Sequence, residues 1–338
     1  MKGICAAGEL LIDFTPCGTS PTGQQLYARN PGGAPANVLA MAARFGVPTR
    51  LCAVVGDDNF GVFLKESVAA AGVDGRFIRQ TRAARTTLAF VDLDANNDRT
   101  FTFYRKPGAD ILLKDDRIPT EALTGCGVFH FSGVSLTEEP ARGAVLRAAE
   151  RAKRAGLLVS FDPNFRPFLW LDAEQAKKEF ARAMYLSDLI KVSEEEARLM
   201  QEAEKSAACG AALAREFGAL VLVSRGEKGA LLADHSGLLA SADALSVDVR
   251  DTTGAGDAFL GSILALIARE GWSGLQALTT TQAERLLRVG CAAGSLAATK
   301  LGAIPALPTA EEVFQAAGLS GAQPVPGTKK AGIQAEGA

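Results

Sequence analysis

Residues 251–257 (DTTGAGD) combine two carboxylates with a turn of small residues. The apolar run at 258–268 that follows has helical spacing, which predicts a helix that begins at about Ala255. The N–H groups of Gly254, Ala255 and Gly256 are then unpaired at the positive end of the helix dipole, and glycine permits a ligand to approach closely. This arrangement is typical of a site for an anion such as phosphate.

Asp257 stands in the first turn of this predicted helix. Beside a bound phosphate, its carboxylate would take the proton from a hydroxyl group that attacks the phosphorus atom, which is general-base catalysis of phosphoryl transfer. The alternative is that Asp257 only complements the helix dipole. The sequence contains neither Gly-x4-Gly-Lys-Ser/Thr nor a complete Gly-x-Gly-x-x-Gly at Gly254, so the predicted anion site is of another kind than these two phosphate motifs.

Polar residues near the N-terminus are also candidates for ligand contacts, because they follow predicted strands or begin a predicted helix. Asp13 ends an apolar, strand-like run at 3–12, and ligands bind at the carboxyl ends of strands in open α/β sheets. Its carboxylate either accepts hydrogen bonds from substrate hydroxyls or is a solvated strand end. Residues 32–33 form a Gly-Gly turn that opens a small-residue helix, and Asn37, one turn later, offers a donor and an acceptor to a polyol. Turn geometry alone also explains paired glycines.

Residues 86–106 are typical of a β-hairpin around the turn-forming residues 94–98. In a chain that otherwise alternates strands and helices, this hairpin predicts an accessory sheet with residues 14–30, which would cover the pocket as a lid. Arg105, at the exit of the hairpin, either reaches an anionic group or a substrate hydroxyl, or is simply solvated.

From residue 126 onward, strand and helix patterns alternate, which predicts βαβ units and a parallel sheet. Arg166 follows the strand predicted at 157–161 and is a candidate for a ligand contact there. Residues 224–229 (SRGEKG) follow the strand predicted at 220–223, and their glycines could flank a nucleotide. An ordinary glycine turn has the same pattern.

Composition limits the classes of partner. The 338 residues carry a net charge of −2 and no basic block, so nucleic acid and anionic membranes are not expected partners. No apolar stretch is long enough to span a bilayer, and charges interrupt the apolar N-terminus, so the protein is expected in the cytoplasm. The six scattered cysteines indicate reduced thiols, and the two histidines lie too far apart in sequence to indicate a His-based metal site.

Two signatures stand at a separation found in a known family, at 31–37 (PGGAPAN) and 251–257 (DTTGAGD). On these motifs the chain resembles the ribokinase-like (PfkB) sugar kinases up to about Leu307. Further stretches are similar to the plant and related bacterial fructokinases in particular, namely 8–14 (GELLIDF), 103–110 (FYRKPGAD), 130–136 (HFSGVSL) and 162–166 (DPNFR).

The resemblance implies an α/β fold, a ribokinase-like three-layer α/β/α domain with a central, mostly parallel sheet and a small β-sheet lid. The kinase domain would cover residues 1–318, with lid strands at about 14–30 and 86–106. Because the lid often contributes to a dimer in this family, a homodimer through the lid sheet is expected. Residues 319–338 have no apolar periodicity and are expected to form a disordered tail.

The resemblance also implies the roles of single residues. Asp257 matches the catalytic base, and the N–H groups of Gly254, Ala255 and Gly256 match the anion hole. The positions that match sugar contacts are Asp13, Gly33, Asn37, Arg105 and Arg166. The positions that match the ATP site are Lys191, Ser193, Glu196, Ser224, Gly226 and Gly229.

Two metal ions follow from the same resemblance. Glu196 belongs to a segment that reads Asn-x-x-Glu in relatives and helps to arrange Mg²⁺ and the phosphates, and it would reach Mg²⁺ through water. Ser193 replaces the Asn here, a change that fructokinases commonly show. Asp251 and Thr253 match ligands of a monovalent cation such as K⁺, together with carbonyl oxygens at 297–302.

The activity implied is ATP-dependent phosphorylation of D-fructose at its terminal primary hydroxyl group, which gives fructose 6-phosphate. A 2-keto-3-deoxygluconate kinase is the alternative, because Arg105 and Arg166 could clamp a carboxylate. Asp110 would repel such an acid if it faces the site. A third hypothesis is a non-catalytic relative that binds sugar or a protein partner as a scaffold, and the intact Asp257 argues against it.

Overall fold

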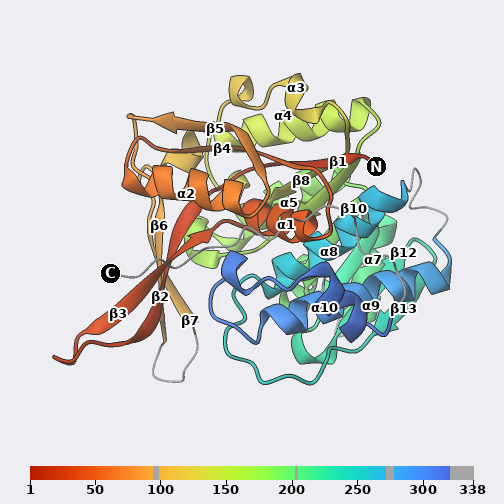
Figure 1. Cartoon of the computed structure of the whole chain (residues 1–338). Coiled ribbons are helices and arrows are strands. Elements are labelled where there is room, and N and C mark those ends of the chain that lie inside the picture. Colours follow the sequence, from red (N-terminus) through yellow and green to blue (C-terminus); the bar gives the residue numbers. More distant parts are fainter. Residues whose placement is uncertain (94–98, 202–204, 272–277, 320–338) are drawn as a thin grey trace.

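The chain folds into two sheets with helices packed around the larger one (Figure 1). The computed structural model describes residues 1–93, 99–201, 205–271 and 278–319. The turn predicted at 94–98 and, apart from Leu319, the predicted tail lie outside the described residues.

The larger sheet has nine strands in the order β13-β12-β11-β10-β9-β8-β1-β4-β5. All neighbours from β5 to β11 pair in parallel, whereas β12 and β13 are antiparallel at one edge. The mostly parallel sheet predicted from the sequence is therefore confirmed. Its strands are β1 (Gly3–Ala7), β4 (Thr49–Gly56), β5 (Asp74–Thr81), β8 (Cys126–Ser132), β9 (Leu158–Asp162), β10 (Leu189–Ser193), β11 (Leu220–Ser224), β12 (Ala230–Asp234) and β13 (Gly237–Ala242).

Helices cover both faces of this sheet, which gives the expected three layers. Successive side chains of β1 point to opposite faces, so Ile4 and Cys5 belong to two different hydrophobic clusters. The first cluster includes α1 (Ala34–Arg44), α2 (Asn59–Ala70), α8 (Ala255–Glu270), α9 (Thr280–Ala297) and α10 (Ala310–Ala316). The second includes α3 (Thr120–Leu123), α4 (Ala141–Arg154), α5 (Ala173–Leu186), α6 (Glu194–Met200) and α7 (Ser206–Phe217).

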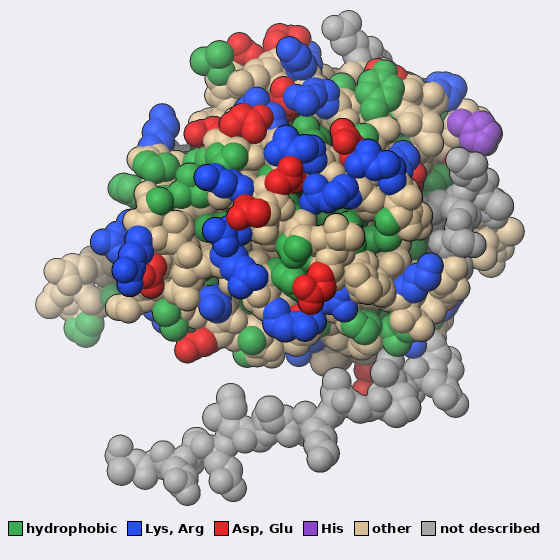
Figure 2. All heavy atoms as spheres, turned by 90° about the horizontal axis from the view of Figure 1, so that it is seen from above, with side chains coloured by type: hydrophobic (Ala, Val, Ile, Leu, Met, Phe, Trp, Pro, Cys, Tyr) green, Lys and Arg blue, Asp and Glu red, His purple; other side chains and the backbone are tan. Residues whose placement is uncertain are grey.

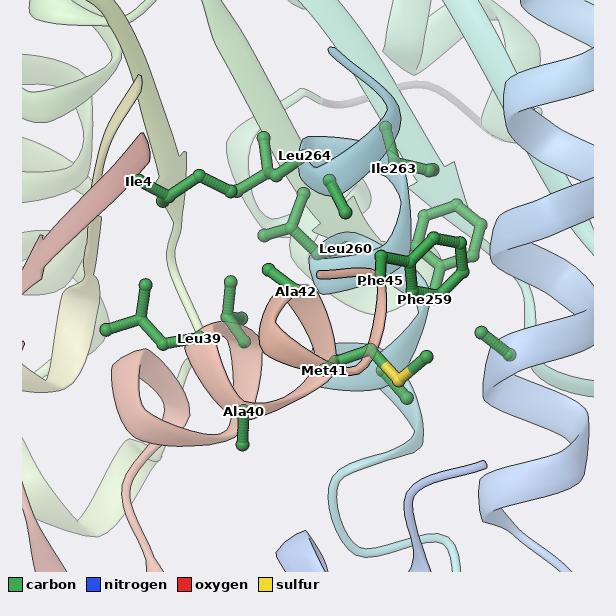
Figure 3. Packing of buried hydrophobic residues seen from close by; sticks show 14 of the residues in the cluster. Ile4, Leu39, Ala40, Met41, Ala42, Phe45, Phe259, Leu260, Ile263 and Leu264 are labelled. Carbon is green, nitrogen blue, oxygen red and sulfur yellow. The ribbon is translucent and has the colours of Figure 1, made fainter. Parts of the chain in front are cut away.

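Helices α1 and α8 pack closely against each other. Gly261 permits this approach, because a Cβ atom there would lie 2.5 Å from the carbonyl oxygen of Val38. Leu39 of α1 and Phe45, which follows its last residue, share one buried cluster with Leu260 and Ile263 of α8 (Figure 3). Since buried side chains are close-packed, the two helices keep a fixed position relative to each other.

The smaller sheet has four strands in the order β3-β2-β6-β7. Aromatic side chains stabilise one of its faces: the Phe14 and Phe90 rings stack with centroids 4.7 Å apart, and Tyr27 and Tyr104 approach Phe90 edge-on. Residues from both predicted lid segments form this sheet. Its strands are β2 (Leu11–Thr19), β3 (Gln25–Gly32), β6 (Leu88–Leu93) and β7 (Arg99–Tyr104).

The single strand-like run predicted before Asp13 is divided between the two sheets. β1 ends at Ala7 and β2 begins at Leu11. The chain turns at Gly8, whose φ is 155° and where a Cβ atom would lie 2.5 Å from the Ser135 hydroxyl. Asp13 therefore lies within the smaller sheet and not at a strand end of the larger one, which corrects the sequence-based placement.

The surface carries charges of both signs. Figure 2 shows Lys and Arg side chains interspersed with Asp and Glu on one face. The ion pairs of the protein include Arg76 with Asp74 at 2.8 Å and Arg151 with Asp115 at 2.9 Å. Within the described ranges, no helix combines the length and apolar character needed to cross a membrane.

Candidate active site

A cavity of about 770 Å³ lies between the smaller sheet and the carboxyl ends of the parallel strands. Its wall includes Leu11, Asp13 and Phe103 from the smaller sheet, and Lys191 and Ser193 from β10. Most residues predicted for the site meet there, although they are scattered from one end of the sequence to the other. They are Asp13, Gly33, Asn37, Arg166, Lys191, Ser193, Glu196, Thr253, Gly254, Gly256 and Asp257.

The N-terminus of α8 forms one wall of this cavity. Gly254 caps the helix with a φ of 76°, and a Cβ atom there would lie 2.8 Å from the Cβ of Ala303. Glycine is therefore required both by the backbone conformation and by the space. Asp257 is the third residue of the helix and lines the cavity, so its carboxylate lies beside the N–H groups of the first turn. The Ala255 N–H is not unpaired as predicted, because it donates to the Thr252 carbonyl oxygen at 3.2 Å.

Asn37 holds the Asp257 carboxylate. Its Nδ2 donates a hydrogen bond of 2.8 Å to Asp257 Oδ2, and both side chains are buried. Burial raises the pKa of Asp257 to about 7, against the hydrogen bond from Asn37. A carboxylate with a pKa near neutral pH is suited to accept a proton. The Asn37 Oδ1 atom is buried and has no hydrogen-bond partner in the described part of the protein.

A charged lysine stands beside the same helix end. Lys191 Nζ lies 2.9 Å from Asp162 Oδ2, and only 3.2 Å from the position that a Cβ atom on Gly256 would take. Burial opposes the charge of Lys191, but the neighbouring carboxylates of Asp162 and Glu196 raise its pKa above the ordinary value. The ammonium group is therefore charged beside the N-terminus of α8.

Ser193 and Glu196 form a capping box at the start of α6. Ser193 Oγ accepts a hydrogen bond from Glu196 N at 3.1 Å, and Glu196 Oε2 accepts one from Ser193 N at 2.7 Å. The second Glu196 oxygen accepts a hydrogen bond from Phe165 N at 2.6 Å. Glu196 thereby connects α6 to the loop after β9. The capping box alone is sufficient to explain why Ser193 and Glu196 occur three positions apart.

The remaining residues predicted for ATP lie on the neighbouring strand. Ser224 pairs with Ser193 in the β10–β11 register and ends its strand. Gly226 and Gly229 follow with φ angles of 57° and 79°. These residues and Ala255 are not among those that line the cavity, but the register places Ser224 directly beside its rim.

Asp13 faces the cavity from the smaller sheet. Burial raises its pKa to about 7, Arg166 lowers it, and Asp251 and Glu9 raise it further. A Cβ atom on Gly32 would lie 2.1 Å from the Asp13 carboxylate, so the Gly-Gly turn leaves the room that this side chain occupies.

The two predicted arginines are placed differently. Arg166 lines the cavity. Arg105 is buried outside the lining, where its guanidinium group pairs with Asp110 at 2.7 Å and donates to Thr137 Oγ1 at 2.7 Å and to the Val134 carbonyl oxygen at 3.2 Å. Arg105 therefore supports the wall that Val134 belongs to.

Asp251 connects the two segments predicted for a monovalent cation. One carboxylate oxygen accepts a hydrogen bond from Thr253 N and the other from Gly302 N, each at 2.8 Å. The Ala298 carbonyl oxygen accepts hydrogen bonds from the N–H groups of Arg250 and Asp251. In the chain as described, no group of three or more His, Cys, Asp or Glu side chains could hold a metal ion.

Several cavity residues were absent from the sequence-based set. Leu11, Phe103, Val134 and Phe168 give the cavity an apolar side. Glu9 also lines it and is 2 % exposed. The signal in the sequence was a lone carboxylate within an apolar run, because such a group is seldom buried without partners.

Known proteins resemble this chain over most of its length. A family model described as pfkB family carbohydrate kinase matches residues 1–310. The chain is 39% identical over 315 residues to probable fructokinase-4 of Arabidopsis thaliana, covering 92% of this chain and 95% of that protein. It is 39% identical over 316 residues to fructokinase-2 of Solanum lycopersicum, with 92% and 94% covered.

Solved structures show the same fold. The fructokinase with bound ATP from Xylella fastidiosa superposes with a TM-score of 0.82 at 30% identity, covering 94% of this chain and 98% of that one. The fructokinase from Vibrio cholerae O395 in its fructose, ADP and calcium ion bound form gives 0.81 at 30% identity, with 93% and 98% covered.

Proposed function

Since the chain belongs to the pfkB family of carbohydrate kinases, we propose that it is a fructokinase that transfers the γ-phosphate of ATP to D-fructose and forms fructose 6-phosphate. The observation that carries this proposal is the buried carboxylate of Asp257, which lies in a sugar-sized cavity at a helix N-terminus. The relatives described as fructokinases, similar over most of the chain, support the choice of sugar.

Asp257 is proposed as the general base. Its pKa of about 7 lets the ionised form exist at neutral pH while keeping enough basicity to take the hydroxyl proton. The hydrogen bond from Asn37 aims one carboxylate oxygen, and the other remains for the substrate. Phosphoryl transfer needs little covalent chemistry from the protein, so positioning and charge stabilisation carry most of the catalysis.

The ATP phosphates are proposed to lie along the start of α8. Lys191 and the N–H groups of Gly254, Ala255 and Gly256 would stabilise the charge that develops on the transferred group. Ser224, Gly226 and Gly229 would contact the nucleotide, since glycines with positive φ expose the backbone to a ligand.

The sugar is proposed to lie against the smaller sheet. Asp13, Gly33, Asn37 and Arg166 would accept from and donate to its hydroxyl groups. The apolar side of the cavity and the covering sheet exclude water, which would otherwise compete with the sugar hydroxyl for the phosphate.

Two metal ions fit the donor atoms present. Glu196 offers carboxylate oxygens beside the proposed phosphate site, and Mg²⁺ prefers such hard ligands and usually keeps several waters. Magnesium would neutralise phosphate charge. Asp251, Thr253 and carbonyl oxygens at 297–302 would supply oxygen donors for a monovalent cation such as K⁺; Asp251 accepts hydrogen bonds from Thr253 N and Gly302 N and so connects the two segments.

The keto-acid alternative is less well supported. A two-arginine clamp for a carboxylate would need Arg105, whose guanidinium group is buried in an ion pair with Asp110. Arg166 alone remains in the cavity wall. A neutral sugar therefore suits the cavity better than 2-keto-3-deoxygluconate.

A homodimer through the smaller sheet, in the cytoplasm, completes the proposal. Tyr104 is 64% exposed and Leu26 44% exposed on this sheet, and a partner subunit that packs there would cover this apolar surface. All six cysteines are free thiols, as expected in a reducing compartment. Light scattering of the purified protein checks the dimer.

Sugar-dependent release of ADP tests the function directly. ATP, Mg²⁺ and K⁺ are supplied with fructose, ribose, adenosine and 2-keto-3-deoxygluconate in separate reactions, and kcat/KM is compared. We expect the highest value for fructose. A higher kcat/KM for the keto acid would favour the alternative kinase, and no release with any substrate would favour a non-catalytic scaffold.

A further inference from the structure

The buried carboxylate of Glu9 lies at the cavity, yet the proposed chemistry gives it no task. It is 2 % exposed and follows the end of β1. Ser132 Oγ lies 2.8 Å from both of its oxygens and shares its one hydrogen between them, and Ser135 Oγ donates to Oε2 at 2.6 Å. Burying a carboxylate is costly unless its hydrogen bonds are made, so this position holds Glu9 in one orientation.

The other partner of Glu9 is the start of α1. Ala34, the first residue of that helix, donates its N–H to Glu9 Oε1 at 3.2 Å. No side chain of the N-cap residue Gly33 can take this role, because glycine has none. A Cβ atom on Gly33 would lie 2.4 Å from the backbone oxygen of Glu9, so the two segments are in close contact.

Asn37 lies one turn into the same helix. The helix is rigid over one turn, and its first backbone hydrogen bond, from Asn37 N to Gly33 O at 3.1 Å, is formed. Asn37 Nδ2 then donates to Asp257 Oδ2. A continuous path of contacts runs from Glu9 through the start of α1 to Asp257.

We propose that Glu9 is a positioning residue for the kinase reaction: by holding the first turn of α1, it fixes the Asn37 side chain that orients the Asp257 carboxylate and contacts the substrate. This inference rests on the proposed function of Asp257. Glu9 touches neither of the reacting groups in this role and acts through Asn37.

Charged groups near the carboxylates of Glu9 and Asp257 affect the pKa values of both, and therefore affect any measurement of pH dependence. Arg105 and Asp13 interact with Glu9, and Asp162, Lys191 and Arg166 interact with Asp257. Removing the charge of Glu9 also changes the pKa of Asp13, so a charge-matched variant is needed to isolate the positional effect.

Glu9→Gln and Glu9→Ala supply this comparison. Both variants lose the charge, but the glutamine oxygen still accepts the Ala34 N–H and its amide donates to a serine hydroxyl. We expect Glu9→Gln to keep kcat within about threefold of wild type. Glu9→Ala is expected to lower kcat at least about tenfold, because small misplacements of catalytic groups cost 10- to 100-fold.

The pH dependence of kcat/KM separates a positioning role from a loss of stability, because destabilisation alone would not shift its acid limb. Loss of the Asn37 hydrogen bond raises the pKa of Asp257, so the acid limb of kcat/KM should move upward by roughly half a pH unit or more in Glu9→Ala relative to Glu9→Gln. Glu179→Ala is the matched control. Glu179 is a buried carboxylate on α5 that pairs with Arg182 outside the cavity, so its loss should lower Tm and leave the acid limb in place.

A double-mutant cycle with Asn37→Ala tests the path. If Glu9 acts through Asn37, Glu9→Ala should lower kcat in the wild-type background and have little further effect once Asn37 is Ala. Equal kcat in Glu9→Ala and Glu9→Gln, or additive losses in the cycle, would overturn the proposal.

A carboxyl titration needs no turnover. The ¹³C signal of Asp257, assigned by its absence in Asp257→Asn, should titrate at higher pH in Glu9→Ala than in Glu9→Gln. A wild-type protein that phosphorylates no sugar would defeat the kinase proposal, while this titration would still decide whether Glu9 positions the Asn37–Asp257 pair. Identical midpoints would overturn the positioning role.

Discussion

Replacing Asp257 with Asn should slow turnover and stabilise the fold at the same time. The amide keeps the shape of the side chain and can still accept the hydrogen bond from Asn37, but it cannot take a proton. General-base catalysis typically contributes 10²- to 10⁴-fold, so kcat should fall at least about 100-fold. KM for the sugar and for ATP should change much less, because the binding groups remain.

The effect on stability follows from the raised pKa of Asp257. Its pKa of about 7 in the folded protein lies above the ordinary value of 3.8, so the fold disfavours the charged form. The resulting cost is absent below about pH 4, where the group is protonated in both states, and is fully present above about pH 7. At about 1.36 kcal/mol for each pKa unit, the cost reaches on the order of 4 kcal/mol.

Thermal unfolding of wild type and Asp257→Asn at pH 4.5 and pH 8 measures this cost. The variant should gain several degrees in Tm at pH 8 and much less at pH 4.5. Asp58→Asn is the control of opposite sign. Partial burial raises the pKa of Asp58, but hydrogen bonds from Thr86 and Gly61 outweigh it and hold that pKa below its ordinary value, so this variant should lose Tm at pH 8.

Two results would refute the reasoning. Near-normal kcat in Asp257→Asn would remove Asp257 from the role of base. A Tm that rises equally at both pH values would show that the gain does not come from the buried charge, and the pKa argument would then fail even if turnover were lost.

Other variants test separate parts of the site. Lys191→Met should lower kcat/KM for ATP by about 10- to 100-fold, as expected for a lost charge-assisted contact, and an unchanged value would place the phosphates elsewhere. Asp13→Asn should raise KM for the sugar and reduce the acid limb of kcat/KM from a two-proton to a one-proton slope, because Asp13 and Asp257 both have pKa values of about 7. Gly254→Ala should lower kcat at least about tenfold through strain at a φ of 76° and contact with Ala303, whereas Gly218→Ala, at a φ of 65° with open space around it, should leave kcat unchanged.

Much of the fold was predictable because the relevant signals are local. Alternating apolar segments from residue 126 onward predicted the parallel strands, and small residues before an apolar run predicted the helix start at Ala255. These patterns depend on neighbours within a few positions. The role assigned to Asp257 remains a proposal, although its place at the helix start and in the cavity agrees with that role.

The parts that escaped prediction depend on contacts between distant segments. The run before Asp13 has one apolar pattern, and only the close approach of Ser135 to Gly8 explains why the chain turns there. Arg105 was a candidate for the substrate because its position after a hairpin does not reveal its partners. Thr137, which follows β8, accepts a hydrogen bond from the Arg105 guanidinium group, and Arg105 is buried there.

The connections of the smaller sheet restrict how the protein can open. β2 follows β1 after three residues, and β3 leads directly into the turn before α1. Asp13 belongs to β2 of the smaller sheet, whereas Asp257 belongs to α8, which packs on the larger sheet. An outward rotation of the smaller sheet would therefore separate Asp13, the proposed sugar contact, from Asp257, the proposed base. On the proposed function, a water molecule that enters while the two carboxylates are apart would meet an incomplete set of groups, and this geometry would disfavour ATP hydrolysis.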